Sequence, residues 1–252
     1  TGHTGSIKSL IFSFDGKYLY SASLDGKVLR WDLSSRTSTN ISENVMPVTS
    51  IDLSSDNKYI AGVSNEGKVV VGDPESSSDN FRIEAAGKTI RSVRFKPDES
   101  ILAVGYTDGY LELWDISKRE RISEVKAHNA GVNDIRFNSK FSQIATAAND
   151  GTMKIWNSRD FTVLPISFDD NEGIVVAIEF SPDGQVIISG TSGKSNNLKG
   201  RASHADLLAA DICSAVSRNF TIDEWIAYIG RDIKYEVTCP DKEYNIKVKE
   251  IK

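Results

Sequence analysis

The sequence has few of the residues that cross-link chains, bind metals or serve as catalytic bases. Its 252 residues include only two cysteines and three histidines. Two cysteines are too few for a disulfide framework over this length, and three histidines provide little material for a metal or catalytic centre. We therefore expect no metal site, no cofactor and no enzymatic activity.

Long apolar runs and an excess of basic residues are also absent. No run approaches 18 apolar residues, the length at which a membrane-spanning helix is expected. No basic segment followed by an apolar one marks a signal peptide. The formal net charge is −5 with Lys and Arg scattered, which argues against a nucleic-acid or anionic membrane surface. We expect a cytoplasmic location. Because the chain opens with Thr-Gly-His rather than Met, we also expect a piece of something longer.

What the sequence does contain is an internal repeat of about 42 residues. An acidic residue followed by glycine recurs at spacings of 41, 42 and 42 residues, in Asp25-Gly26, Glu66-Gly67, Asp108-Gly109 and Asp150-Gly151. An upstream apolar position recurs at spacings of 41, 42, 42 and 43 residues, in Phe12, Leu53, Phe95, Phe137 and Phe180. Registers that agree this closely indicate one structural unit used repeatedly.

The local pattern within each unit is that of β-strands. In the fourth unit, two short runs, 143–148 and 152–156, flank Asn149-Asp150-Gly151. An Asp-Gly pair between such runs predicts a hairpin, because glycine adopts positive φ at little cost. Four short strands in about 42 residues are typical of a propeller blade, so we predict an all-β propeller.

Three of the units resemble the WD repeats. They read FSFDGKYLYSASLDGKVLRWDL, FKPDESILAVGYTDGYLELWDI and FNSKFSQIATAANDGTMKIWN, and the resemblance covers residues 1 to about 200. It implies a β-propeller whose blades carry a hydrogen-bonded set of His, Ser or Thr, Asp and Trp. By register the sets are His3, Ser21, Asp25 and Trp31 in the first unit and His128, Thr146, Asp150 and Trp156 in the fourth. The second and third units depart from the pattern, so weaker networks are expected there.

A His, Ser and Asp set also allows a catalytic interpretation, which we do not favour. The same residue types recur from unit to unit, whereas a nucleophile is usually unique. A structural set satisfies buried polar groups that would otherwise cost about 1–3 kcal/mol each. We expect these residues to hold each blade together.

Four complete units and part of a fifth are present, with predicted blades at residues 1–43, 44–86, 87–128, 129–170 and 171–200. The WD-repeat resemblance implies a larger ring, most often of seven blades, so upstream blades are expected beyond this chain. A closed five-bladed ring is the alternative. Of the four signature positions in the fifth unit only Ser189 matches, which makes the later strands of that blade doubtful.

Residues 201–252 have a different character, that of a helical extension with a terminal strand. Ser203 and Thr221 each begin a helix-capping pattern. The string SRNFTIDEWIAYIGRDIKYEVTCP resembles the end of many bacterial multidomain WD-repeat proteins, which implies a bacterial signalling protein. For Cys213 and Cys239 two interpretations stay open: separate buried thiols, which we favour, or one disulfide.

A rigid ring with variable loops predicts a protein-interaction scaffold or sensor that binds protein or peptide. The positional candidates for partner binding lie in the strand-connecting turns and in the loops before each first strand: Leu24, Asn44, Met46, Asn65, Lys88, Thr107, Asn129 and Asn149. Two alternatives are kept, an assembly subunit that completes its ring with another chain and a propeller hydrolase.

Overall fold

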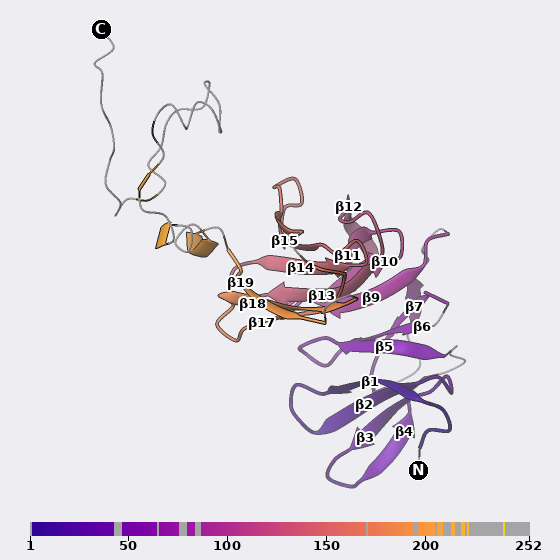
Figure 1. Cartoon of the computed structure of the whole chain (residues 1–252). Coiled ribbons are helices and arrows are strands. Elements are labelled where there is room, and N and C mark those ends of the chain that lie inside the picture. Colours follow the sequence, from indigo (N-terminus) through magenta and orange to yellow (C-terminus); the bar gives the residue numbers. More distant parts are fainter. Residues whose placement is uncertain are drawn as a thin grey trace. The chain divides into compact units, whose positions relative to one another are not determined.

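The computed structural model of the chain divides into two compact units, Thr1–Gly200 and Arg201–Lys252. The structure describes residues 2–42, 47–64, 66–75, 80–83, 87–169, 171–193, 196–204, 206–208, 213–214, 218–219, 221 and 239. The first unit holds five antiparallel β-sheets, which we call blades 1 to 5 (Figure 1).

The first four blades each have four strands that follow one another in chain order within the sheet. Blade 1 contains β1 (Ile7–Phe12), β2 (Tyr18–Ser23), β3 (Val28–Asp32) and β4 (Thr37–Asn40). Blade 2 contains β5 (Val48–Leu53), β6 (Ile60–Ser64), β7 (Val69–Gly72) and β8 (Phe81–Ile83). Blade 3 contains β9 (Ile90–Phe95), β10 (Ile101–Tyr106), β11 (Tyr110–Asp115) and β12 (Glu120–Lys126). Blade 4 contains β13 (Val132–Asn138), β14 (Gln143–Ala148), β15 (Met153–Asn157) and β16 (Ile166–Phe168).

Blade 5 has three described strands, β17 (Ile174–Phe180), β18 (Val186–Ser192) and β19 (Leu198–Ala202), in that order. From the sequence, the later strands of this blade were doubtful. The third strand, β19, does form, and it pairs with β18. The loop before β19 is longer than in the other blades, which is why the signature register did not reveal this strand.

A glycine lies in the hairpin turn between the second and third strands of each of blades 1 to 4. Gly26, Gly67, Gly109 and Gly151 all have positive φ, between 71° and 86°. Side chains rarely adopt this conformation, and it matches the right-handed twist of the flanking strands. The acidic-Gly repeat in the sequence is therefore the mark of this turn.

The hydrophobic core lies between consecutive blades. Leu111 and Leu113 of blade 3, for example, pack with Val132, Ile135 and Ile144 of blade 4. Similar clusters join blade 1 to blade 2, blade 2 to blade 3 and blade 4 to blade 5. Each blade thus buries apolar surface on the next one, so a single blade would not be stable alone.

In the second unit, residues 206–208 and 213–214 are helical, and the Leu208 N–H donates to the His204 carbonyl at 3.1 Å. Cys213 and Cys239 form a disulfide, so the favoured interpretation as separate thiols was wrong. The buried Asn219 side chain makes two hydrogen bonds of 2.8 Å with the backbone of Cys239. The predicted second helix and terminal strand lie outside the described residues. In the part of the chain that the structure describes, no helix is long and apolar enough to cross a membrane.

Candidate functional site

The predicted set of blade 1 comes together in one network. His3 Nε2 lies 2.7 Å from Ser21 Oγ, and His3 Nδ1 lies 3.1 Å from Asp25 Oδ2. The Trp31 indole N–H donates to the same Ser21 hydroxyl at 2.7 Å. Asp25 also accepts hydrogen bonds from the backbone N–H groups of Thr4 and Lys27. The network joins the loop before β1 to β2, β3 and the turn between them.

Blade 4 contains the same set with one difference. His128 Nε2 lies 2.7 Å from Thr146 Oγ1, which accepts from the Trp156 indole at 3.0 Å. His128 Nδ1, however, bonds the hydroxyl of Thr152 at 2.7 Å, and Thr152 in turn donates to Asp150 at 2.7 Å. Asp150 itself lies 3.5 Å from His128. A threonine hydroxyl therefore mediates between the imidazole and the carboxylate.

Burial and the polar partners of these groups shift their pKa values in opposite directions. Burial disfavours the charged form of Asp25, but hydrogen bonds from Thr4, Lys27 and His3 outweigh it and lower the pKa of this carboxyl well below its usual value. Burial lowers the pKa of His128 to about 4, and the attraction of Asp150 offsets this only in part. His128 is consequently neutral at pH 7.

The hydroxyls of these networks lack the setting of a nucleophile. Ser21 and Thr146 are buried, and each accepts a hydrogen bond from an indole while it contacts a histidine. A reacting hydroxyl needs an open side from which a substrate approaches. This geometry supports the structural role over the catalytic one.

Blade 3 satisfies its indole in another way. The buried carboxylate of Glu112 accepts from the Tyr106 hydroxyl at 2.6 Å and from the Trp114 indole at 2.9 Å. Arg121 donates to its other oxygen at 2.9 Å. Burial and the bond to Glu112 raise the pKa of the Tyr106 hydroxyl. The three donors lower the pKa of Glu112 against the effect of burial, so the acid is charged and fully engaged.

Blades 2 and 5 lack a complete set. Blade 2 has Gly62 and Gly72 where blade 4 has Thr146 and Trp156. In blade 5, Asn171 takes the histidine position; its amide donates to the Gly151 carbonyl at 3.1 Å and it accepts from Ser189 at 3.5 Å. The weaker networks expected in blade 2 therefore have a direct cause in the sequence.

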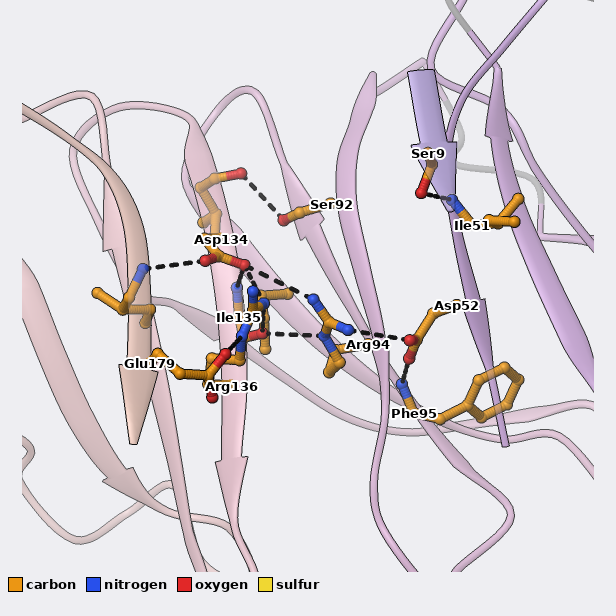
Figure 2. Close-up of polar contacts among 12 residues, drawn as sticks. Ser9, Ile51, Asp52, Ser92, Arg94, Phe95, Asp134, Ile135, Arg136 and Glu179 are labelled. Atoms are coloured by element: carbon orange, nitrogen blue, oxygen red, sulfur yellow. Dashed lines mark hydrogen bonds and ion pairs between the residues drawn. The ribbon is translucent and has the colours of Figure 1, made fainter. Parts of the chain in front are cut away.

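A second polar system joins the first strands of consecutive blades (Figure 2). Asp52 in blade 2 accepts from the backbone N–H of Phe95 at 2.6 Å and from the Arg94 guanidinium at 2.9 Å. Asp134 in blade 4 accepts from the backbone N–H of Ile178 in blade 5 at 3.0 Å. Side chains of one blade thus bond the backbone of the next.

Two arginines also belong to this polar system, which we call the ladder of the first strands. Arg94 donates to the Ile135 carbonyl at 3.3 Å, and Arg136 bonds both Asp134 and Glu179. Burial raises the pKa of Asp52 and Asp134, and the guanidinium groups beside them favour the charged form. Sequence reasoning missed these residues, because an acid or arginine in a half-buried strand has the pattern of a solvent-facing position.

The described candidates for partner binding lie at one end of the strands, the edge of the blades at which the second and third strands are joined. Leu24, Thr107 and Asn149 occupy equivalent turns, and Lys88 and Asn129 lie in the loops beside them. Lys88 Nζ lies 3.8 Å from the centre of the Tyr110 ring and 3.4 Å from Glu124. Asn129 donates its backbone N–H to Asp150 at 2.8 Å. Asn44, Met46 and Asn65 lie outside the described residues. Among the residues the structure describes, no group of three or more His, Cys, Asp or Glu is placed to hold a metal.

Comparisons with known proteins agree with this architecture. The model for the anaphase-promoting complex subunit 4 WD40 domain matches residues 51–140, and the model for the WD domain, G-beta repeat, matches residues 1–32 and 164–199. With the five sheets described above, these matches place the chain among the WD40-repeat β-propeller proteins. Proteins of this class are generally scaffolds without catalytic activity that bind other proteins.

Individual relatives are similar over part of their length. A WD repeat-containing protein 26 homolog from Arabidopsis thaliana is 27% identical over 123 residues, which are 47% of this chain and 21% of that protein. Two solved structures, titled "Structure of U3-55K" and "Crystal structure of RRP9 WD40 repeats", each have a TM-score of 0.70 and 20% identity. Each match covers 79% of this chain and 62% of the other. The chain therefore spans less than two thirds of the length of each of these three proteins.

Proposed function

We propose that this chain is a protein-interaction scaffold that binds its partner along the edge formed by the turns at Leu24, Thr107 and Asn149. The observation that carries the proposal is a shared backbone contact. The N–H groups of Leu24, Thr107 and Asn149 donate to the carbonyls of Ser6, Thr89 and Gly131, at 3.0, 2.9 and 2.9 Å. The backbone at this edge is held in the same way in three blades while the side chains differ.

Such an edge suits recognition for a physical reason. Fixed backbone positions reduce the entropy lost when a partner binds, and side chains that differ from blade to blade supply specificity. The identity of the partner follows from those side chains and not from the repeat.

The test is affinity purification from native cells, quantified by mass spectrometry, with the wild-type chain and the triple variant Leu24→Ala, Thr107→Ala and Asn149→Ala. The matched control changes three exposed residues in turns at the opposite strand ends, Ser35→Ala, Lys118→Ala and Arg159→Ala. We expect specific partners to be lost with the first variant and kept with the control, while both variants retain the wild-type circular dichroism. Equal recovery with both variants would contradict the proposal.

We also propose that further blades of the same ring cover both end faces of the five described here. Leu10 of β1 is 60% exposed, whereas Ile51, Val93 and Ile135, at the same register in blades 2 to 4, are at most 5% exposed. At the other end, Ile188 and Leu198 of blade 5 are 46% and 80% exposed. Apolar faces of this kind in a soluble protein are normally covered.

The most specific expectation is that these blades belong to the same polypeptide and that the domain serves as a sensor in a bacterial multidomain signalling protein in the cytoplasm. It rests on the resemblance of the C-terminal segment, most of which lies outside the described residues, and it stays a prediction. An assembly subunit, completed by blades of another chain, is the alternative. The length of the encoding reading frame upstream of Thr1 distinguishes the two.

A further inference from the structure

Blade 4 carries a hydroxyl at a position that is apolar in blades 1 and 3. Ser158 follows the third strand at the register of Leu33 and Ile116. The Ser158 N–H donates to the Ser142 carbonyl at 2.9 Å, and 42 residues earlier the Ile116 N–H donates to the Ser100 carbonyl at 2.8 Å. The two backbones are therefore held alike. Ile116 is buried in the apolar cluster between blades 2 and 3, whereas blade 4 offers a hydroxyl at the same place.

That hydroxyl is enclosed and unpaired. Ser158 is 5% exposed, and its side-chain oxygen has no hydrogen-bond partner among the residues that the structure describes. Native proteins leave few buried polar groups unsatisfied, because each one loses its bonds to water. The Ser158 hydroxyl therefore indicates an occupant beside it that the chain itself does not supply.

A cavity of about 140 Å³ lies beside Ser158, between blades 3 and 4. A single water needs roughly 10–15 Å³ of such space, so the cavity has room for about ten waters or for one small molecule. Three of its lining residues, Asp98, Ser139 and Arg159, are exposed, which places its mouth at the surface. The space is already present in the structure, so a ligand enters it without rearranging the lining.

The lining combines hydroxyl and amide groups with apolar surface and has no net charge. Its members are Lys96, Pro97, Asp98, Glu99, Phe137, Asn138, Ser139, Ser142, Gln143, Ser158 and Arg159. Two of them are basic and two are acidic, so their formal charges cancel. Lys96, the least exposed of the four, already has its Nζ 2.7 Å from Glu99 Oε1. An ion of either sign would find no unbalanced charge to meet it.

We propose that this cavity is a binding site for a small uncharged polyhydroxyl molecule, from the size of glycerol to that of a single sugar ring. Hydroxyls of such a ligand pair with Ser158 and with the neighbouring polar side chains, and its C–H groups contact Phe137 and Pro97. A few placed polar groups on partly apolar walls are typical of small-molecule sites. The site lies at the strand ends opposite to the edge proposed for partner binding, and it does not depend on that proposal.

The test is saturation-transfer difference NMR on the whole chain, with glycerol, myo-inositol and D-glucose as probes. We expect a saturable signal from at least one probe, with a dissociation constant in the millimolar range. Ser158→Ile introduces the residue that blade 3 has at this position, so the variant folds, and its melting temperature should be no lower than that of the wild-type chain. The larger side chain occupies the cavity, so the same probe should bind roughly tenfold more weakly or not at all.

Two further variants and one competitor sharpen the result. Ser158→Ala removes only the hydroxyl and should weaken binding by about threefold to tenfold, the loss expected for one hydrogen bond. Ser38→Ile is the matched control on an exposed position of β4 and should leave binding unchanged. Inorganic phosphate should not displace the probe. The proposal is overturned if no probe gives a saturable signal, which would leave water as the occupant, if Ser158→Ile binds as well as the wild-type chain, or if phosphate competes.

Discussion

Among the single residues, His128 is the clearest example of a histidine whose role in this domain is structural. Its side chain is enclosed, its two nitrogens bond Thr146 and Thr152, and it stays neutral. A catalytic histidine must reach a substrate to exchange a proton with it, whereas both nitrogens of His128 are occupied within the blade. Here the imidazole joins a loop to β14 and to the turn before β15, and its ionisation would break that connection.

We predict that the stability of the domain falls as pH decreases from 6.5 to 4. The folded-state pKa of His128 is about 4, below the ordinary 6.5, so the unfolded chain binds the proton first and is favoured across this interval. Above pH 6.5 this contribution is fully present, and below pH 4 it is lost. A difference of this size corresponds to roughly 3 kcal/mol. Urea unfolding across this range measures it.

The control for that prediction is His128→Asn, which does not titrate. The variant should be less stable at pH 7 and should show a shallower dependence between pH 6.5 and 4. Identical slopes for the variant and the wild-type chain would mean that other groups, not His128, dominate the acid response.

We predict that Glu112→Ala destabilises the domain by about 3 kcal/mol, because it leaves the buried Tyr106 hydroxyl and the partly buried Trp114 indole without an acceptor. Tyr106→Phe is the comparison: it removes one donor and leaves the carboxylate its other partners, so it should cost about 1 kcal/mol. Thermal or urea unfolding measures both. A smaller loss for Glu112→Ala than for Tyr106→Phe would show that Glu112 does not organise blade 3.

At the level of strands and blades, much of the structure follows from repeat spacing. The acidic-Gly pair marks a positive-φ turn, and a one-residue slip in strand pairing would turn every side chain of a strand to the opposite face, so a position that recurs at equal distance from this turn is a strong signal. The sets of blades 1 and 4 follow from the same register.

Other features have no such signal. Thr152 stands where blade 1 has Lys27 and blade 3 has Tyr110, and nothing in that series indicates a hydroxyl bridge. Glu112 and Asp52 are acids within strands, a pattern typical of solvent-facing positions, yet both are buried. Their burial depends on donors from elsewhere in the fold, which only the structure brings into contact. The Cys213–Cys239 disulfide is a further case, because spacing alone does not decide pairing.

The contact between blades 4 and 5 yields a prediction at this level. Asp134→Ala removes the acceptor of the Ile178 N–H, so that amide in β17 should exchange with solvent about tenfold faster, as the loss of about 1.4 kcal/mol of local protection implies. Hydrogen exchange followed by NMR measures the rate. Glu179→Ala is the control: its side chain is mostly exposed, and the Ile178 amide should keep its rate. Equal effects of the two changes would contradict the role given to Asp134.

For the molecule as a whole, the exposed end faces govern solution behaviour. We predict that residues 1–252 produced alone self-associate and bind an apolar dye such as anilinonaphthalene sulfonate, since large apolar patches promote both. The double variant Leu10→Lys and Phe12→Lys should reduce dye binding and association. Leu164→Lys is the control, because Leu164 is 91% exposed but lies in the loop before β16 rather than in a first strand.

Sedimentation analysis over a range of concentrations, with dye fluorescence, distinguishes the outcomes. If the wild-type chain is a monomer at all concentrations and binds no more dye than the double variant, the end faces need no cover. The proposal of further blades would then be wrong.

The ladder of the first strands also has a direction. Ser9 accepts from Ile51, Asp52 from Phe95 and Asp134 from Ile178, so in each case the earlier blade supplies the side chain and the later blade the backbone. A ribosome delivers these blades in the same order. When blades 2, 3 and 5 leave the exit tunnel, the side chain that accepts from their first strand has therefore already been synthesised.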